Sequence, residues 1–313
     1  MKVLKALIDE FNKIVTVGFG KAYDGYTNKE AALVGSYKVP ASSASQAVFG
    51  MFLDGLQKVT GTPIPSETLP EAAQVVIPHD PYAKRVEIPE ADFERAQTVA
   101  DLDLYQAHVR GLAVLAKDFP IETALDMIDA GATTSMGKCF DGKALFANDH
   151  FYGEATGQDN LLSGTGTSAA QIAADLKSAI SALEGFVYKS GNRYKKFNKN
   201  VKPLVICDVT KKGIFEDLLK QESIGGTTNT LRNSFEIVAE KLANASDWYV
   251  MDQDNGGVAV NAPIINPVEK EAKLENNIGQ ESQILDHILR YQVYLRGGFG
   301  YGAWWKIVKV DNA

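Results

Sequence analysis

Residues 92–118 read DFERAQTVADLDLYQAHVRGLAVLAKD, and the rest of the chain is organised around this stretch. Apolar or small residues recur in it at steps of three and four, which places them on one face of a helix. They are Phe93, Ala96, Ala100, Leu104, Ala107, Gly111 and Leu115. As one helix the stretch would be about 40 Å long at roughly 1.5 Å per residue. It therefore predicts a rod that connects distant parts of an elongated molecule. An ordinary core helix of a large domain is the alternative. A second alternative concerns its start: residues 92–100 would belong to the preceding strand, which leaves a helix from Asp101 only.

Length and composition are those of a globular protein with a sizeable core. The chain has 313 residues, of which 45% are hydrophobic and 23% charged, as expected for one large domain or two smaller ones. The net charge of −7 argues against a dedicated nucleic-acid binder, whose surface carries an excess of basic residues. Cys139 and Cys207 are the two cysteines. They provide neither a disulfide framework nor a Cys/His metal spacing, and they fit a reducing cytoplasm.

The N-terminus, MKVLKALIDEFNKIV, begins like a signal peptide, but Asp9, Glu10 and Lys13 interrupt the apolar run too early for one. The apolar residues instead form one stripe of a short amphipathic helix. They are Val3, Leu4, Leu7, Ile8, Phe11, Ile14 and Val15. No run of about 18 apolar residues occurs, so we expect no membrane span. Residues 17–40 are weakly patterned. We expect an extended arm docked on a neighbouring subunit, with a long surface loop as the alternative.

Residues 41–90 predict a two-stranded projection. A short apolar segment at 47–59 is followed by 61–70 (GTPIPSETLP), in which three prolines exclude a regular element. Two segments rich in β-branched residues, 73–77 and 83–88, flank the turn-forming sequence PHDP at 78–81. We interpret them as the two strands of the projection, with a flexible tip near 60–70.

The remaining sequence mixes helices and strands without a strict βαβ alternation, which favours an α+β fold. A proline at 120 and a glycine at 131 predict a second helix between them, and Thr167 or Ser168 predicts the start of another. The glycine pair at 297–298 predicts a turn between the last two strands. The predicted helices are 121–130, 168–186 and 211–221. The predicted strands are 204–207, 235–238, 248–251, 258–265 paired with 270–274, and two strands between 284 and 310.

Three groups of residues are candidates for chemistry, and each has a plainer interpretation. The loop from Gly164 to Ser168 could bind an anion at a helix N-terminus, but it lacks a P-loop pattern and is better explained as a capped turn. Asp141, Asp149 and His150 provide too few ligands for a metal site. We interpret Asp141 as part of a hairpin turn and the other two as residues of a loop. No constellation supports a catalytic site, a metal site or a cofactor site.

Residues 189–202 read KSGNRYKKFNKNVK. They carry six basic residues and no acid, interleaved with Tyr194 and Phe197. This pattern is similar to a loop that binds single-stranded nucleic acid. In an acidic chain, a solvated loop or an interface with acidic neighbours is the favoured interpretation. Charge reversal at Lys195 and Lys196 would then weaken association with those neighbours.

Several segments in the same order resemble the Mu-like phage major head subunit family. The strongest lies between Cys139 and Gly166, CFDGKALFANDHFYGEATGQDNLLSGTG. Its matching residues are Asp141, Gly142, Phe146, Asp149, His150, Asn160, Leu161 and Leu162. Further matches are the helix at 120–131, WYVMD at 248–252, PII at 263–265 and the aromatic–glycine ending RGGFGYGAWW. The resemblance covers roughly residues 95–310, whereas the first ninety residues depart from the family pattern.

The resemblance implies an HK97-like capsid fold, and the parts expected from the residues can be assigned to it. Residues 1–40 would be an N-terminal arm and 41–90 an extended β-hairpin loop. Residues 91–135 and 285–313 would form a peripheral domain with the long spine helix, and 136–284 would be mainly an axial domain.

The function implied by the resemblance is that of a major capsid protein, not an enzyme. Copies of the chain in hexamers and pentamers would assemble in the host bacterial cytoplasm into the icosahedral shell of a tailed bacteriophage virion. The shell would enclose double-stranded DNA without sequence-specific binding. Scaffold, decoration and portal proteins are further expected partners, and no cofactor or membrane is expected. Two alternatives stay open: a non-viral compartment shell of the same fold, and a nucleotide- or metal-dependent enzyme using Gly164 to Ser168 or Asp149 with His150.

Overall fold

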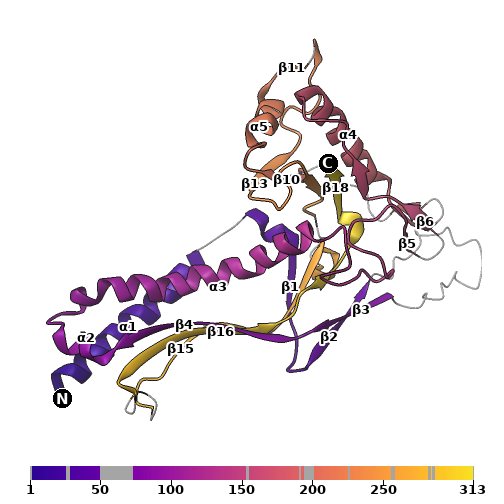
Figure 1. Cartoon of the computed structure of the whole chain (residues 1–313). Helices are drawn as coiled ribbons and strands as arrows, with labels where there is room; N and C mark the ends of the chain where they lie inside the picture. The colour runs from indigo at the N-terminus through magenta and orange to yellow at the C-terminus, as the bar shows by residue number, and fades with distance from the viewer. Residues whose placement is uncertain are drawn as a thin grey trace, which may run out of the picture.

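A computed structural model describes residues 2–25, 29–49, 73–152, 155–189, 192–193, 201–224, 226–254, 258–280, 283 and 286–312. The molecule is elongated: two long helices lie along a long, narrow sheet, and a second body of sheet and helices stands at one end of it (Figure 1). The mixture of helices and strands confirms the predicted α+β class. The predicted loop tip near 60–70 and residues 194–200 of the basic segment lie outside the described residues.

The first sheet has the strand order β1–β15–β16–β4, with the short strand β17 also paired to β15. Strand β1 runs parallel to β15, and the other neighbours are antiparallel. The bounds are β1 Val34–Lys38, β4 Asp80–Pro89, β15 Ile264–Asn276, β16 Ile288–Gly297 and β17 Gly300–Tyr301. Because β4, β15 and β16 are long, the sheet extends beneath most of the length of the helical layer (Figure 1).

The long helix is real, but it starts and ends later than predicted. Helix α3 spans Asp103–Asp129. The short helix α2 (Glu90–Arg95) ends at Ala96, whose ψ of 133° is extended. A capping box between Thr98 and Asp101 then starts the 3-10 turn η2 (Val99–Leu102), which leads into α3. The prediction of one helix over 92–118 is therefore wrong at its start, because this capping box begins a new element. The alternative start at Asp101 is close to the observed start of α3 at Asp103, although residues 90–95 are helical and not part of a strand.

Pro120 lies inside α3 and does not end it. A proline in a helix interior removes one backbone hydrogen bond. The residues that follow it are nevertheless buried at intervals of three or four, as Ile121, Ala124, Met127 and Ile128. The hydroxyl of Thr123 also donates to the carbonyl of Phe119 at 2.8 Å. Residues 103–118 of the first predicted helix and the second predicted helix, 121–130, thus form one element through tertiary packing.

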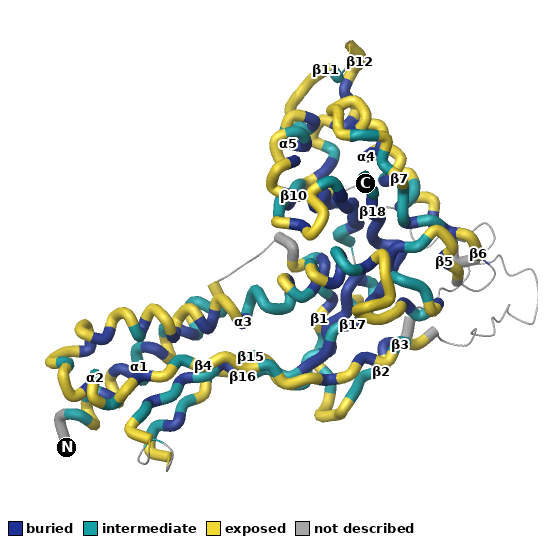
Figure 2. The backbone as a smooth tube through the Cα atoms, in the orientation of Figure 1, coloured by how far each residue is buried: buried dark blue, intermediate teal, exposed yellow. Residues whose placement is uncertain are grey.

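The helical face predicted from 92–118 is mostly the exposed face of α3. Leu104 is 67% exposed and Leu115 48% exposed, and Gly111 between them borders open space. The buried face consists of Gln106, Val109, Leu112, Ala113 and Ala116. Figure 2 shows the resulting alternation of buried and exposed positions along the helix.

Helix α1 spans Lys2–Gly25, so the predicted amphipathic helix is confirmed and is longer than expected. Its buried residues Ile8, Phe11, Val15 and Phe19 face the first sheet and α3. The ring of Phe11 meets those of Phe93 and Tyr291 edge-on, at centroid distances of 5.2 and 5.8 Å.

The prediction of an extended segment over 17–40 is wrong for its described residues up to Leu33, whereas 34–38 are extended as strand β1. Helix α1 continues to Gly25, the 3-10 turn η1 covers Lys29–Leu33, and β1 follows at once. The apolar stripe of α1 continues through Phe19, which is buried with Leu112 and Val293. This burial of the helix's last turns explains why the chain stays helical beyond 17.

The predicted strands on either side of residue 79 both exist, but they do not pair with each other. Strand β3 (Ala73–Pro78) pairs with β2 (Ala44–Phe49), and these two strands form a ribbon that we call the β2–β3 ribbon. Strand β4 instead pairs along its whole length with β16. The predicted pairing is wrong because the chain does not reverse direction at PHDP (78–81). It passes there from the β2–β3 ribbon into the first sheet.

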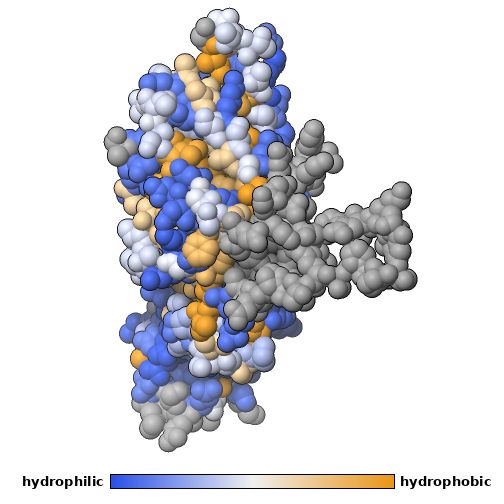
Figure 3. Space-filling model, turned by 90° about the vertical axis from the view of Figure 1, so that its right-hand side faces the viewer, coloured by the Kyte–Doolittle hydropathy of each residue, from blue (hydrophilic) through white to orange (hydrophobic). Residues whose placement is uncertain are grey.

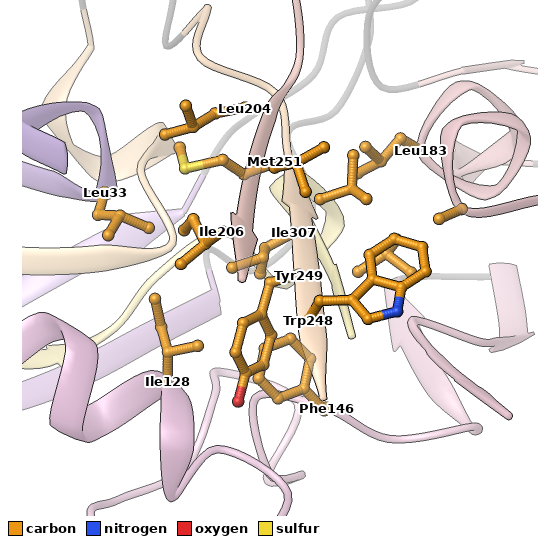
Figure 4. Close-up of a cluster of buried hydrophobic side chains, with 14 of the residues drawn as sticks. Leu33, Ile128, Phe146, Leu183, Leu204, Ile206, Trp248, Tyr249, Met251 and Ile307 are labelled. Atoms are coloured by element: carbon orange, nitrogen blue, oxygen red, sulfur yellow. The ribbon is translucent and has the colours of Figure 1, made fainter. Parts of the chain in front are cut away.

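The second sheet has the strand order β13–β10–β14–β18–β7 and carries the largest core. Its strands are β7 Leu161–Ser163, β10 Leu204–Asp208, β13 Glu236–Glu240, β14 Trp248–Met251 and β18 Ile307–Asp311. Helices α4 (Ala169–Gly185) and α5 (Lys212–Lys220) pack against it. Figure 4 shows Ile206, Tyr249 and Ile307 of this sheet with Leu183 of α4 in the common core. The predicted helices 168–186 and 211–221 and the predicted strands 204–207, 235–238 and 248–251 are confirmed, each within about two residues of its expected ends.

Short elements complete the described chain. They are the strand pairs β5 His150–Tyr152 with β6 Ala155–Gln158, β8 Val187–Lys189 with β9 Asn192–Arg193, and β11 Ser223–Ile224 with β12 Thr227–Thr228, and the 3-10 turns η3 Ala259–Asn261 and η4 Trp304–Lys306.

Two predicted strand pairs are wrong. Residues 258–265 and 270–274 are not two strands, because η3 is followed by the single strand β15. The last two strands do not form a hairpin, because β16 lies in the first sheet and β18 in the second. The glycines at 297–302 instead allow close approach: a Cβ on Gly298 would lie 2.1 Å from the carbonyl oxygen of Pro78.

Replacing Asp101 by alanine tests the turn that starts α3. Hydrogen bonds from the N–H groups of Thr98 and Gln97 lower the pKa of Asp101 below its usual range. A carboxyl group with a lowered pKa stabilises the fold above its ordinary pKa, and this contribution is lost as the pH falls through the lowered value. We expect Asp101→Ala to melt at a lower temperature than the parent at neutral pH, with the gap narrowing in acid. Melting curves followed by circular dichroism measure both. A gap that is independent of pH contradicts this role.

Candidate functional site

Asp141 and Asp149 lie in the loop between α3 and β5, whereas His150, expected in a loop, is the first residue of β5. Gly142 adopts a φ of +76° and donates its N–H to the carbonyl of Cys139 at 2.9 Å. The N–H of Cys139 in turn donates to the carbonyl of Lys143. The turn predicted at Asp141 is thus confirmed, and it places this carboxylate inside the protein.

His150 is held on all sides and has no exposed surface. Its Nδ1 lies 2.6 Å from Oδ2 of Asp141, and its Nε2 lies 3.1 Å from the carbonyl oxygen of Leu145. The imidazole also stacks on Trp304 with a centroid distance of 4.3 Å. Both ring nitrogens already have protein partners, so this histidine offers no lone pair for a metal or a substrate.

Asp149 points the other way and does not join His150. Its carboxylate is about half exposed and forms an ion pair with Lys143. That pairing lowers the pKa of Asp149 below its usual range, chiefly through the hydrogen bond from Lys143. Among the residues that the structure describes, no three His, Cys, Asp or Glu side chains are grouped as a metal site. The geometry therefore does not assemble the Asp149/His150 centre.

Asn160 locks this loop to the end of the chain and is fully buried. Its side-chain amide donates to the carbonyls of Leu145, Trp304 and Ile307 at 2.8, 3.0 and 3.3 Å. Its side-chain oxygen accepts from the N–H of Ala147 at 2.9 Å. We call Asp141, His150, Asn160 and Trp304 the polar lock. Asp141, His150 and Asn160 come from the most distinctive sequence segment, 139–166, and the role of the lock is to fix the backbone.

The turn from Gly164 to Ser168 caps α4. The hydroxyl of Ser168 donates to Oε1 of Gln171, and the backbone N–H of Gln171 points back at that hydroxyl. The donors of Thr165, both N–H and hydroxyl, bind the carboxylate of Asp175 at 2.9 Å. A buried carboxylate thus occupies the donors that an anion would need. The predicted capped turn is confirmed, and the geometry does not provide a nucleotide site.

The C-terminal end of α3 is tied to the second sheet by Asp129. Its carboxylate accepts from the hydroxyl of Tyr249 at 2.9 Å and from the N–H of Ala243 at 2.7 Å. Burial, and then the charge of Asp129, raise the pKa of Tyr249 well above its usual range. Phe146 stacks against the same tyrosine (Figure 4). No local pattern could reveal this tie, because its partners are 120 residues apart.

The surface carries apolar residues that the described part of the chain leaves exposed. Leu104, Val114 and Leu115 are exposed on α3, Val17 is exposed on α1 and Val76 on the β2–β3 ribbon. Another face shows apolar side chains gathered near its middle among polar ones (Figure 3). Single exposed apolar residues are ordinary, but a face on which several gather is the kind of surface at which other molecules pack. Surfaces, and not an internal cleft, are therefore the candidate functional sites.

Comparison with known proteins agrees with the resemblance given by the residues. Residues 67–203 match the family described as Mu-like prophage major head subunit gpT. This match covers β3, β4, α3, the loop of the polar lock and α4. No curated protein sequence matches the chain.

Solved structures share the fold at low sequence identity. The procapsid of bacteriophage JBD30 is 13% identical with a TM-score of 0.53, over 98% of this chain and 76% of that chain. The mature capsid of bacteriophage PhiM1 is 11% identical with a TM-score of 0.55, over 92% and 88%. A virus-like particle from Pyrococcus furiosus is 11% identical with a TM-score of 0.51, over 96% and 98%. The predicted HK97-like capsid fold is thereby confirmed.

Changing Asn160 to aspartate tests the polar lock. The substitution replaces the donating amide by an oxygen that faces three carbonyl oxygens in a buried site. A buried group left without partners costs about 1–3 kcal/mol, and more when charged, so we expect the free energy of unfolding to fall by at least about 2 kcal/mol. Urea denaturation measures it. Asn148→Asp, at an exposed position of the same loop, is the matched control. Equal effects of the two substitutions contradict the lock.

Both cysteines should be unreactive in the folded chain. Burial, and then the nearby charge of Asp141, raise the pKa of Cys139 well above its usual range. Burial raises the pKa of Cys207 to about 12. Because the thiolate is the reactive form, we expect no maleimide adduct at neutral pH and two adducts in denaturant, as read by intact mass. An adduct on the folded chain contradicts the burial described here.

Proposed function

We infer that the chain belongs to the Mu-like prophage major head subunit family and is the major capsid protein of a tailed bacteriophage. The family match over residues 67–203 carries this conclusion. It includes the long helix and three residues of the polar lock, Asp141, His150 and Asn160. The chain builds the phage head from many copies of itself.

Assembly is the work that this architecture can perform. A rod with helices on one side, a ribbon projecting from one end and a second body offers several separate surfaces for neighbours (Figure 1). We propose hexamers and pentamers that close into an icosahedral shell. Stable interfaces bury on the order of 1,200–2,000 Å² each. Repeated over a closed symmetric shell, many modest contacts give high total stability. The exposed apolar residues of α3 and of the ribbon support this proposal, because neighbours would cover them.

The domain assignment follows from the same proposal. Residues 1–40 act as the arm, 41–90 as the extended loop, 91–135 with 285–313 as the peripheral domain, and 136–284 as the axial domain. The packing of α1 along α3 and the first sheet supports grouping it with the spine helix in the isolated chain. The position of β18 in the second sheet favours counting residues 307–311 with the axial part.

The shell would enclose double-stranded DNA without gripping it. The net charge of −7 supports this, since cationic contacts dominate binding to the phosphate backbone. We propose that assembly takes place in the cytoplasm of a host bacterium, with scaffold, portal and decoration proteins as partners. Among the residues described, no helix is long and apolar enough to cross a membrane.

A non-viral compartment shell is the second candidate, because the fold is also that of the virus-like particle from Pyrococcus furiosus. The contents of purified particles distinguish the two functions. Nuclease-protected double-stranded DNA in particles from phage-producing cells supports the phage head. Particles that contain protein cargo and no DNA favour the compartment.

Replacing Leu104 and Leu115 by glutamate tests whether the exposed face of α3 is an assembly surface. Both side chains are exposed in the single chain, so the fold should survive, with an unchanged melting temperature. In a shell the two charges would face a neighbour, and we expect sedimentation velocity to show loss of large particles. The control Gln97→Glu with Ser178→Glu adds the same charge at exposed polar positions. Normal particle yield from the leucine variant contradicts the assigned surface.

A further inference from the structure

The β2–β3 ribbon is attached to the first sheet through a corner that contains a buried histidine. Strand β3 ends at Pro78 and β4 begins at Asp80, so His79 alone separates the ribbon from the sheet. Its side chain has no exposed surface. A polar ring buried at a corner is costly unless its nitrogens are hydrogen-bonded. The partners of His79 therefore decide how the corner is held.

Three partners surround the imidazole of His79. Its Nδ1 lies 3.1 Å from the carbonyl oxygen of Ser42 and 3.4 Å from Oε2 of Glu269. A carbonyl can only accept, so Nδ1 carries the proton. In the neutral ring Nε2 is then an acceptor, and it receives the hydroxyl of Ser45 at 2.7 Å. Ser42 and Ser45 belong to the ribbon side, whereas Glu269 lies on β15 of the first sheet.

Glu269 is the centre of this cluster, with a side chain that is only 2% exposed. Arg296 on β16 donates to its Oε1 at 3.2 Å, and the N–H of Ser42 points at its Oε2 at 3.4 Å. A buried carboxylate is stable only when paired and hydrogen-bonded. The cluster thus joins the start of the ribbon, the corner and two strands of the first sheet.

An apolar contact supports the same corner. Ile77 of β3 is buried in a notch left by two glycines that follow β16. A Cβ on Gly300 would lie 2.7 Å from Cγ1 of Ile77, and one on Gly298 would lie 2.7 Å from its Cγ2. This packing holds the ribbon against the sheet, but apolar contacts are not directional. The angle between the ribbon and the sheet therefore has to be set by the hydrogen bonds of His79 and Glu269.

We propose that Ser45, His79, Glu269 and Arg296 form a latch that sets the angle at which the β2–β3 ribbon leaves the first sheet. His79 is the positioning residue, because it joins the ribbon to Glu269. The angle of the ribbon decides which surface of a neighbouring copy it can reach. This last step rests on the proposed shell function, whereas the latch itself does not.

Spin labels on the ribbon and on the sheet measure the angle directly. The exposed positions Gln74 and Lys273 are changed to cysteine and labelled, since the native cysteines are buried. The labelled full chain is diluted with unlabelled chain, so that each electron–electron distance reports one molecule. We expect a narrow distance distribution in the parent. His79→Ala and Glu269→Gln should give a broader distribution with a displaced maximum.

Two further variants separate positioning from general structural damage. His79→Asn keeps a donor where Nδ1 stands and should restore the narrow distribution. His287→Asn removes an exposed ring that pairs with Glu90 at the end of β4 opposite the ribbon, and this variant should change nothing. If His79→Ala does not fold, Ser45→Ala removes a single bond of the latch and should still broaden the distribution.

Unchanged distances in folded His79→Ala, Glu269→Gln and Ser45→Ala overturn the latch. If the distances change in these variants but the yield and shape of the particles do not, the role of the latch in assembly is overturned. A parent chain that forms no particles but shows the expected distance changes supports the latch and counts against the shell function instead. The two proposals therefore fail in distinguishable ways.

Discussion

The packing of the last turns of α3 outweighs the break that Pro120 would otherwise impose, and the rest of the molecule depends on this balance. A proline in a helix interior costs about 3 kcal/mol. Against this, Ile121, Met127 and Ile128 are buried, and each such side chain contributes roughly 1.5–3 kcal/mol relative to exposure. Burial therefore wins, and α3 stays one rod. Its first half lies on α1 and the first sheet, while Asp129 ties its end to Tyr249 of the second sheet.

Local patterns in the sequence predicted most single elements, whereas pairings between distant segments escaped them. The amphipathic helix at the N-terminus and the capped helix at Ser168 follow from neighbouring residues alone. The start of α3 was also readable in principle, since Thr98 and Asp101 have the spacing of a capping box. The pairing of β4 with β16 was not, because it joins residues more than 190 apart and β3 is the nearer candidate.

The residues on which the family resemblance rests hold the backbone in place. His150 and Asn160 carry the polar groups that usually indicate chemistry, yet both bind buried carbonyls or a carboxylate of their own chain. Such a lock requires particular residue types at fixed spacing, which is why it leaves a readable pattern. The surfaces proposed for assembly leave none, because exposed apolar residues such as Leu104 only gain meaning once the structure shows which face is covered.

The central claim is that this chain is a shell subunit whose rod, ribbon and second body contact different neighbours. Electron microscopy of the purified, expressed chain tests it most directly. We expect closed shells or rings of six subunits, with the long helix of each subunit visible in the averaged density. Dispersed monomers at high protein concentration, across the salt and pH range in which the chain stays folded, would contradict it.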